Sequence, residues 1–369
     1  ATQMPHSLKD KLAETLGRDA DTIRVIAPDV GGGFGAKAGL YIEFPVLAVL
    51  AEMFGRPVTW TETRSEDMVA LAHSRAQIQY CETGFDEDGK LTGMRVRLVG
   101  DAGAYPSMGA LLPGLTKQMA NGTYNFPKVR FDVAVAITNT SPTGAYRGAG
   151  RPEATALIER AMDQASIELG IDPLEIRRRN FIQSDQFPFD TLTGWTYDTG
   201  DYVTSMEKAA EIIGYDDLRD QQRERREEGS NRALGIGVAS YVEVTSGGGG
   251  SEYASLEIHD DGTATMKAGT SAHGQGHQTS FAMIVSEHTG IPVESITLIQ
   301  SDTDIVPRGG GTGGSRSLQL GGSAVKEATD AVIEKAKDLT AHLLEASVDD
   351  IVVNTDNGTV GVAGVPATA

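Results

Sequence analysis

The first 65 positions hold two helix-like apolar patterns that bracket a glycine-rich turn. Leucines recur every four residues between Ser7, a capping residue type, and Gly17, which predicts a helix. A nearly continuous apolar run predicts a second helix, bent at Pro45. The expected elements are helices over Ser7–Gly17 and Gly39–Gly55, and strands over Thr22–Pro28 and Pro57–Thr63.

Beyond residue 75 the pattern changes to alternation of apolar and polar residues, which indicates half-buried strands. Residues 76–85 and 91–105 alternate on either side of Asp86–Lys90, and this arrangement predicts a β-hairpin. We further expect a strand at Val129–Thr140, a helix at Pro152–Gly170, and a helix at Asp172–Ile182 capped by Asp172.

The second half of the chain follows the order strand, strand, helix, strand, helix. The expected strands lie within residues 233–244, 253–270 and 295–302, and the helices at 276–290 and 321–346. A charged stretch before them is expected to be an exposed linker. The order predicts an α+β fold, with a first module over residues 1–222, a linker at 223–232 and a second module over 233–369.

Charge and cysteine content narrow the class of protein. Asp and Glu number 51 against 32 Lys and Arg, for a formal net charge of −19. Such a chain repels nucleic acid and anionic membranes, so neither is an expected partner. Cys81 is the only cysteine, which excludes an internal disulfide and a cysteine-based iron–sulfur or zinc site. It also favours a reducing, cytoplasmic compartment, and no window has a membrane-spanning apolar length.

The first glycine-rich turn has two interpretations. Gly31, Gly33 and Ala36 match the G-x-G-x-x-[G/A] fingerprint of nicotinamide dinucleotide-binding folds, and Glu62 ends the next expected strand. Against this, Asp29 would face the pyrophosphate, Glu62 lies beyond the usual spacing of about 20 residues, and the following segments pair as hairpins. The glycines still suit a close anionic ligand before a helix.

Three more glycine-rich turns lie at element junctions, at residues 140–154, 269–280 and 307–324. Arg147 can present its guanidinium to a carboxylate, a phosphate or a polar substrate, or form an inter-domain salt bridge. Gln275 can hydrogen-bond an amide-like or pterin-like edge, whereas His277 has no second ligand at zinc spacing. Arg316 and nearby hydroxyls suit an anion, and Phe34 either packs on a neighbouring domain or lines a pocket. Together the turns suggest one large, phosphate-bearing ligand between the modules.

Six motifs occur in the order found in the molybdenum-binding subunit of molybdenum hydroxylases: GGGFGAK, DAGAY, NTSPTGAYRGAGRPEA, GIDPLEIRRRNFI, AHGQGH and GTGGSRS. The chain therefore resembles the superfamily of xanthine oxidase, aldehyde oxidase and carbon monoxide dehydrogenase large subunits. The resemblance implies two α+β modules with mixed and antiparallel sheets and a molybdenum cofactor between them. It implies hydroxylation of an aldehyde or N-heterocycle, with water as the oxygen source.

The resemblance also implies a cofactor set and partners. Molybdenum is held by a pterin, expected as molybdopterin cytosine dinucleotide, so no residue of the chain is expected to bind the metal. Electrons are expected to leave through a 2Fe–2S subunit to an FAD subunit, in a homodimer of heterotrimers. Because the chain has one cysteine, the clusters must lie outside it.

Residue roles carry over by position in the motifs. Phe34 is expected beside the molybdenum ligands, Gln275 is expected to hydrogen-bond the cofactor, and Arg147 is expected to orient the substrate. These three are the candidate catalytic residues. The expected cofactor-binding residues are Gly33, Phe34, Gly35, Arg147, Gly274, Gln275, Gly276, His277, Thr312, Gly313, Gly314, Ser315, Arg316 and Ser317.

Some positions depart from the family pattern. Gly148 stands where carbon monoxide dehydrogenases carry a copper-binding cysteine, which argues against CO oxidation. Ala149 replaces a phenylalanine, and Ala38 replaces a glutamate, of the purine-oxidising enzymes. The family's base, a glutamate in a Gly-x-Gly-Glu motif, is not found. We therefore expect the sequence to be the middle of a longer subunit, and to be inactive alone because a general base must reach its proton.

Two alternatives differ in class. One is a nicotinamide-dependent dehydrogenase that uses Gly31–Ala36, which antiparallel strands after Thr63 would exclude. The other is a non-catalytic cofactor-binding or assembly module that keeps the fold.

Overall fold

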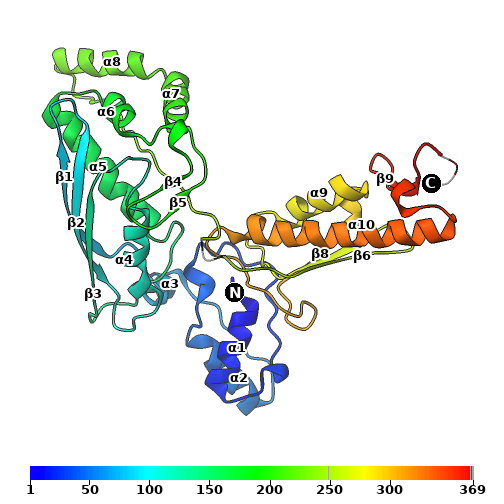
Figure 1. Cartoon of the computed structure of the whole chain (residues 1–369). Coiled ribbons are helices and arrows are strands. Elements are labelled where there is room, and N and C mark those ends of the chain that lie inside the picture. Colours follow the sequence, from blue (N-terminus) through cyan, green and yellow to red (C-terminus); the bar gives the residue numbers. More distant parts are fainter. Residues whose placement is uncertain (248, 366, 368–369) are drawn as a thin grey trace. The chain divides into compact units, whose positions relative to one another are not determined.

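The structure is a computed structural model that describes residues 1–247, 249–365 and 367. Contacts divide the chain into unit 1, Ala1–Arg64 with Val244–Ala369, and unit 2, Ser65–Glu243 (Figure 1). The first 64 residues join the C-terminal segments through backbone hydrogen bonds, such as that from Ala27 N to the Ser301 carbonyl at 2.9 Å. This grouping differs from the modules predicted at 1–222 and 233–369, whose boundaries remain a prediction.

Unit 2 is built on a three-stranded sheet in the order β1-β2-β3. The hairpin pair β1/β2 is antiparallel, as predicted, and β3 runs parallel to β2. Helices α4 and α5 contact this sheet and lie along one side of it in Figure 1. The elements are α3 (Arg64–Ala70), β1 (Gln77–Phe85), β2 (Leu91–Asp101), α4 (Met108–Met119), β3 (Val129–Ala136), α5 (Arg151–Leu169), α6 (Pro173–Asn180), β4 (Phe189–Asp190), β5 (Thr196–Tyr197), α7 (Tyr202–Ile213) and α8 (Tyr215–Glu227).

Unit 1 repeats this arrangement with a second sheet in the order β6-β7-β8. Again the first pair is antiparallel and the third strand is parallel to its neighbour. Helices α9 and α10 pack against it around an apolar core. The elements are α1 (Pro5–Leu16), α2 (Glu43–Phe54), β6 (Ala254–Ile258), β7 (Ala264–Ala268), α9 (His277–Thr289), β8 (Ile296–Ile299), the π-helix η5 (Ser317–Gly322), α10 (Ser323–Leu343), β9 (Ile351–Asn354) and β10 (Thr359–Val362), with short 3₁₀ turns between them.

The mixed and antiparallel sheets confirm the predicted α+β class. Local turn chemistry was also predicted well. Asp86 Oδ1 accepts from the Lys90 amide at 2.8 Å in the hairpin turn, and Asp172 caps α6 by accepting from the Leu174 amide at 2.8 Å. These signals act within a few residues, so tertiary packing does not override them.

Three predicted strands were wrong. Thr22–Pro28 makes only an isolated bridge between Ile26 and Asp302, and Pro57–Thr63 and 233–244 have no strand pairing among the described residues. An apolar run signals burial, but a strand also needs a neighbouring strand to pair with. Without a strand before the first glycine turn, and with antiparallel β1/β2 after it, the structure does not favour the nicotinamide dinucleotide-binding alternative.

Helix limits also differ from the sequence expectations. Helix α1 begins at Pro5, two residues before Ser7, since proline suits the first turn, where no N–H is needed. Pro45 lies in the first turn of α2 for the same reason, so it interrupts no helix-interior hydrogen bond. Helix α4, which contains Pro113, was not predicted.

A buried ion network closes the core of unit 2. Arg177 is fully buried, and its Nε donates to Glu159 Oε2 at 2.9 Å. Its other nitrogens reach Asp163 Oδ1 at 2.7 Å and the carbonyls of Pro173 and Val238 at 2.9 and 3.0 Å. Several buried hydrogen bonds on one guanidinium hold α5, α6 and the segment before residue 243 together.

Candidate functional site

The glycine-rich turn at residues 29–38, here called the Phe34 loop, follows an unusual backbone path. Gly31, Gly32 and Gly35 have φ of 67°, 88° and 98°, and Phe34 itself has φ of 55°. Positive φ values belong to the left-handed region of backbone conformation, which disfavours a residue with a side chain. The Phe34 ring folds back over Gly32, where a Cβ would come within 2.6 Å of it. Glycine at position 32 is therefore required for the turn that carries Phe34, which is 51% exposed.

Gln3, which the sequence did not single out, holds the Phe34 loop in place through hydrogen bonds. Its Oε1 accepts hydrogen bonds from the backbone amides of Gly35 and Lys37 at 2.8 and 3.1 Å. Its Nε2 donates to the Thr312 carbonyl at 3.0 Å. A glutamine before an amphipathic helix carries no pattern of its own, so only the fold reveals this role.

Residues 269–277, here called the Gln275 loop, lie between β7 and α9. Gly274 and Gly276 have φ of 107° and 77°. The Gln275 side chain accepts from the His273 amide at 2.5 Å and donates to the Ser271 carbonyl at 3.3 Å. The side-chain amide thereby shapes its own loop, while the residue itself stays exposed.

His277 is buried at the start of α9, with an imidazole face stacked on Phe281 at 4.9 Å between ring centroids. Its Nδ1 lies 3.2 Å from Gln300 Oε1, an oxygen that only accepts, so Nδ1 carries the proton. Burial lowers the pKa of His277. Its Nε2 is then an unprotonated acceptor, and that atom is buried with no hydrogen-bond partner among the described residues.

His273 lies on the same loop as His277. Its Nε2 is also buried and lacks a partner within the described part of the chain. Burial, together with the nearby His277 and Lys37, lowers the pKa of His273 to about 4. Both imidazoles are therefore neutral near pH 7, and both offer a nitrogen to a ligand.

Residues 308–317, here called the Thr312 loop, bring the predicted hydroxyl groups together. Thr312 Oγ1 donates to the Ser271 carbonyl at 2.8 Å and lies 2.8 Å from Ser317 Oγ. Gly314 and Ser315 have left-handed φ of 59° and 58°. Gly313 lies against Met4, where a Cβ would meet the methyl carbon at 3.0 Å.

The Arg316 guanidinium is paired within unit 1. Its Nη1 lies 3.1 Å from the buried Glu252 carboxylate, and its Nη2 donates to the Ser251 carbonyl at 3.1 Å. Glu252 also accepts from the Gly310 amide at 3.2 Å, and the guanidinium covers Gly310 so closely that a Cβ there would overlap it. Arg316 thus supports the Thr312 loop, and its predicted contact with the cofactor stays a prediction.

Unit 1 brings these three loops together although about 280 residues separate the first from the last. Gly32 N donates to the His273 carbonyl at 3.1 Å, and Gly311 N donates to the Gly269 carbonyl at 3.1 Å. All the predicted cofactor-binding residues except Arg147 lie on these loops. The grouping makes one cluster of glycine amides, hydroxyls and neutral imidazoles.

Arg147 lies in unit 2, in a turn that needs small residues. Gly148, Ala149 and Gly150, which follow it, have φ of 103°, 40° and 98°. A Cβ at position 148 would come within 2.4 Å of the Pro152 ring. The turn therefore exposes Arg147 just before helix α5.

Arg75, which sequence reasoning missed, holds this turn in place. It donates to the Arg147 carbonyl at 2.5 Å and to both Glu153 oxygens at 3.2 Å. Glu153 in turn accepts from the Gly150 amide at 3.0 Å, and the Arg75 guanidinium lies 5.8 Å from the Tyr146 ring centroid. Arg75 is a positioning residue for the Arg147 turn.

The loops of unit 1 fit a pterin dinucleotide chemically. A pterin carries N–H groups and ring nitrogens that can pair with His277 Nε2, an acceptor, and with His273 Nε2, and among the described residues these buried atoms have no other partner. Phosphates suit glycine amides and hydroxyls at turns. Among the described residues no group of three or more His, Cys, Asp or Glu side chains is arranged to hold a metal ion.

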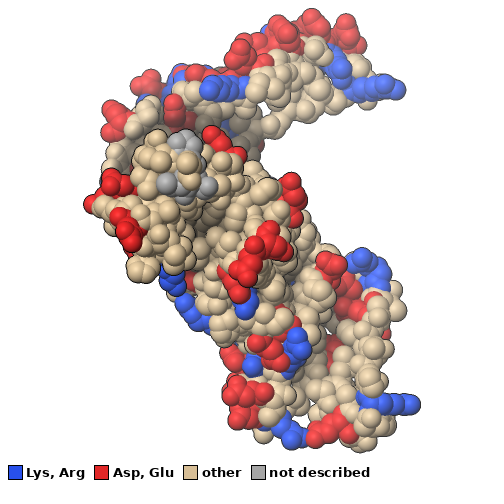
Figure 2. Space-filling view, turned by 90° about the vertical axis from the view of Figure 1, so that its right-hand side faces the viewer, with Lys and Arg blue, Asp and Glu red and all other residues tan. Residues whose placement is uncertain are grey.

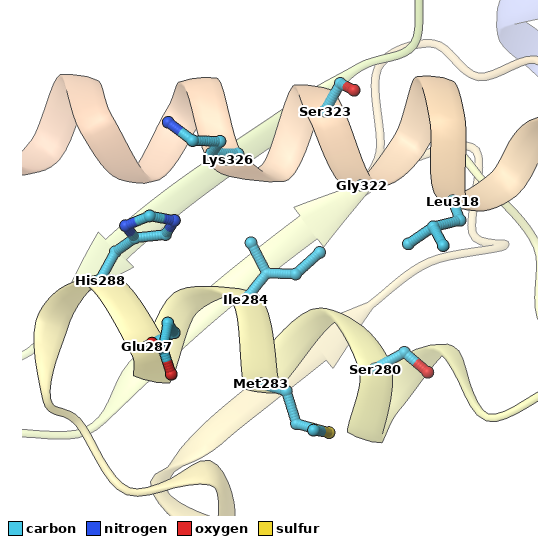
Figure 3. Close-up of a pocket in the computed structure, with 9 residues that line it drawn as sticks. All are labelled: Ser280, Met283, Ile284, Glu287, His288, Leu318, Gly322, Ser323 and Lys326. Atoms are coloured by element: carbon cyan, nitrogen blue, oxygen red, sulfur yellow. The ribbon is translucent and has the colours of Figure 1, made fainter. Parts of the chain in front are cut away.

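A groove of 630 Å³ lies elsewhere in unit 1, between α9 and the η5–α10 segment. In Figure 3, Ile284 and Leu318 lie in the space between the two helices, with His288 and Lys326 toward the other end. No residue predicted to bind the cofactor lines it. The groove is open and mixed in character, so it does not define a second chemical site.

Charge and hydropathy add two findings on the surface. Figure 2 shows acidic side chains in several groups over the visible face, with basic ones between them, in keeping with the net charge of −19. Of the helices in the described ranges, none combines the length and apolar character needed to span a bilayer.

Both halves of the chain match a known domain family. Residues 1–181 and 208–368 each match the model of a molybdopterin cofactor-binding domain. The chain is 35% identical to the carbon monoxide dehydrogenase large chain of Hydrogenophaga pseudoflava, over 95% of this chain and 46% of that protein. It is 32% identical to the nicotine 6-hydroxylase large subunit of Paenarthrobacter nicotinovorans, over 99% of this chain and 46% of the relative.

The fold is also similar to that of a solved enzyme. Quinoline 2-oxidoreductase from Pseudomonas putida 86 superposes with a TM-score of 0.91 at 33% identity, covering 100% of this chain and 48% of that one. The chain thus spans about half the length of the relatives that it matches.

Proposed function

The chain belongs to the molybdopterin cofactor-binding family of molybdenum oxidoreductases, and on that premise we propose that it forms part of the molybdenum subunit of a hydroxylase. The single observation that carries the proposal is the convergence of the Phe34, Gln275 and Thr312 loops around two neutral imidazoles. Their buried Nε2 atoms have no hydrogen-bond partner in the part of the chain that the structure describes. The proposed cofactor is molybdopterin cytosine dinucleotide.

The chain's own residues bind and orient in this proposal. His277 Nε2 would accept from a pterin N–H group, because Gln300 keeps the His277 proton on Nδ1, and His273 Nε2 would form a second hydrogen bond with the pterin. Other amides of the Phe34 and Thr312 loops, beyond those that bond Gln3, Glu252 and backbone carbonyls, would hold the polar and phosphate groups together with the Ser317 hydroxyl. When bound, the cofactor supplies the two-electron oxidation chemistry at molybdenum.

The proposed substrate class rests on the family resemblance and on the form of the Arg147 turn. We propose an aldehyde or an N-heterocycle, with Arg147 orienting it through its guanidinium. Position 148 has no room for a side chain, because a Cβ there would meet Pro152 at 2.4 Å and φ is 103°. This supports the interpretation that no copper-binding cysteine belongs there. Relatives that are named as nicotine and quinoline enzymes make N-heterocycles the first substrates to test.

The proposed partners are those that the family resemblance implies. One cysteine cannot hold a 2Fe–2S cluster, so the clusters lie outside this chain, and we propose 2Fe–2S and FAD subunits in a homodimer of heterotrimers. Burial raises the pKa of the Cys81 thiol to about 11, so it is a poor nucleophile. We propose a cytoplasmic location on the same cysteine usage.

The proposal is tested by expressing the chain in cells that make the molybdenum cofactor. We expect the purified protein to carry molybdenum, measured by mass spectrometry of the metal, and to release a fluorescent pterin and cytidine monophosphate after oxidation and acid hydrolysis. Protein from a host that cannot make the pterin is the control. The proposal would be overturned if the folded protein carried neither molybdenum nor pterin, whether purified alone or with its subunits.

A further inference from the structure

Gln3 makes an unusually complete set of contacts between two of the cofactor loops. It is only 3% exposed. Besides its three side-chain hydrogen bonds to Gly35, Lys37 and Thr312, its backbone N donates to the Lys37 carbonyl at 2.9 Å. Its own carbonyl accepts from the Thr312 amide at 3.1 Å. One residue thus joins segments that lie 34 and 309 positions away from it.

Two glycines of the motifs make room for this residue. A Cβ at Gly33 would lie 2.5 Å from Gln3 Cδ, and a Cβ at Gly311 would lie 2.3 Å from the Gln3 carbonyl oxygen. Gly311 also has a left-handed φ of 63°. These glycines therefore admit the Gln3 backbone and side chain as well as any ligand.

Only an amide of this length satisfies both loops. Its oxygen takes two N–H donors, and its nitrogen gives a hydrogen to a carbonyl. A glutamate would keep the oxygen contacts with Gly35 and Lys37 but would place a second oxygen against the Thr312 carbonyl. A leucine of similar size would leave two amides and one carbonyl, all partly buried, without their partner.

We propose that Gln3 is a positioning residue that sets the placement of the Phe34 loop against the Thr312 loop, so that both can hold the cofactor at once. The inference rests on the proposed function of these loops. Gln3 itself contacts their backbone, and it acts on the cofactor through the Gly35 amide next to Phe34 and through the Thr312 peptide.

The test compares Gln3→Leu and Gln3→Glu with Gln221→Leu and Gln221→Glu, matched changes at an exposed glutamine of α8 in unit 2. The full chain is expressed in cells that make the cofactor. Molybdenum and pterin per chain are measured, together with the thermal unfolding midpoint of the cofactor-free form and the Mo(V) paramagnetic resonance spectrum of the loaded fraction.

We expect Gln3→Leu to lower the cofactor content about tenfold or more, because three partly buried groups lose their partner, and Gln3→Glu to lower it less. The loss should occur in protein that is folded at the loading temperature, and the remaining molybdenum should show shifted g-values. The Gln221 variants should match the wild type.

Folded Gln3 variants with wild-type cofactor content and an unchanged spectrum would overturn the inference alone. Wild-type protein without molybdenum would overturn the proposed function, and the inference with it. If Gln3→Leu does not fold, Gln3→Glu decides the question, since it keeps the two contacts with the Phe34 loop.

Discussion

Both units tie distant segments together with one buried polar side chain, but they use different chemistry. In unit 2, the Arg177 guanidinium forms ion pairs with Glu159 and Asp163 and hydrogen bonds to backbone carbonyls. In unit 1, Gln3 uses a neutral amide. The Arg177 network is satisfied from within, whereas the loops around Gln3 leave two imidazole nitrogens without partners among the described residues.

The difference separates a structural network from a binding site. A buried charge is strongly destabilising when its partner is lost, so the Arg177 network makes unit 2 sensitive to the removal of either partner. A neutral clamp costs less to bury and adds no strong field where a dinucleotide would bind. Buried polar atoms without a partner are rare in a native fold, and here two of them lie on the loops that the sequence motifs predict to bind the cofactor.

The largest effect is expected from Arg177→Ala in unit 2. Removing the guanidinium leaves the buried Glu159 carboxylate without its charged partner. This change should lower the free energy of unfolding by about 3–5 kcal/mol. Each unit holds one of the two tryptophans, Trp60 in unit 1 and Trp195 in unit 2. Urea unfolding followed by Trp195 fluorescence in a Trp60→Phe background reads unit 2. Arg178→Ala, at a partly exposed ion pair, should change the free energy of unfolding by less than about 1 kcal/mol. Equal effects of the two substitutions would show that the buried Arg177 network is no more important than an exposed ion pair.

The next effect is expected from Gly311→Ala, which drives a methyl group into the Gln3 carbonyl. We expect unit 1, read by Trp60 in a Trp195→Phe background, to lose about 3 kcal/mol from steric overlap and left-handed backbone together. Gly314→Ala is the matched control, since Gly314 has a similar φ of 59° but nothing within 4 Å of a Cβ. It should lose only about 1 kcal/mol. Indistinguishable variants would show that Gln3 does not pack tightly.

A pH effect should follow from His273. Its pKa is about 4 in the folded chain against an ordinary value of 6.5, so between these values the unfolded chain binds more protons. Acidification from about pH 6.5 to 4 should therefore destabilise cofactor-free unit 1 by about 2 kcal/mol. The Trp60 urea midpoint at each pH measures this. The slope should flatten in His273→Gln, and an unchanged slope would show that the imidazole is not desolvated.

The smallest effect is expected at the start of α6, the helix that carries Arg177. Asp172→Ala removes the side chain that accepts from the Leu174 amide and should cost about 1 kcal/mol. Trp195 unfolding measures it beside Arg177→Ala. A loss as large as that of Arg177→Ala would mean that unit 2 depends on the α6 cap as much as on the buried arginine.

The sequence by itself determined the local structure and the chemical parts of the site. The β1/β2 hairpin, the Asp172 cap and the glycine turns were predicted because their signals lie within a few residues. The order of the motifs also identified the family that the comparisons then showed. Extended segments such as Thr22–Pro28 were predicted wrongly, since strand pairing depends on a neighbour that the local pattern does not contain.

Only the tertiary structure decided which parts meet. Gln3 and Arg75 carry no motif, yet they hold the loops of Phe34 and Arg147 through backbone atoms that any sequence would present. Arg316 was predicted as a cation for the cofactor, but the fold pairs it with Glu252. Residue type fixes what a side chain can donate or accept, whereas the partner is set by long-range packing, and that packing is what leaves the nitrogens of His273 and His277 open.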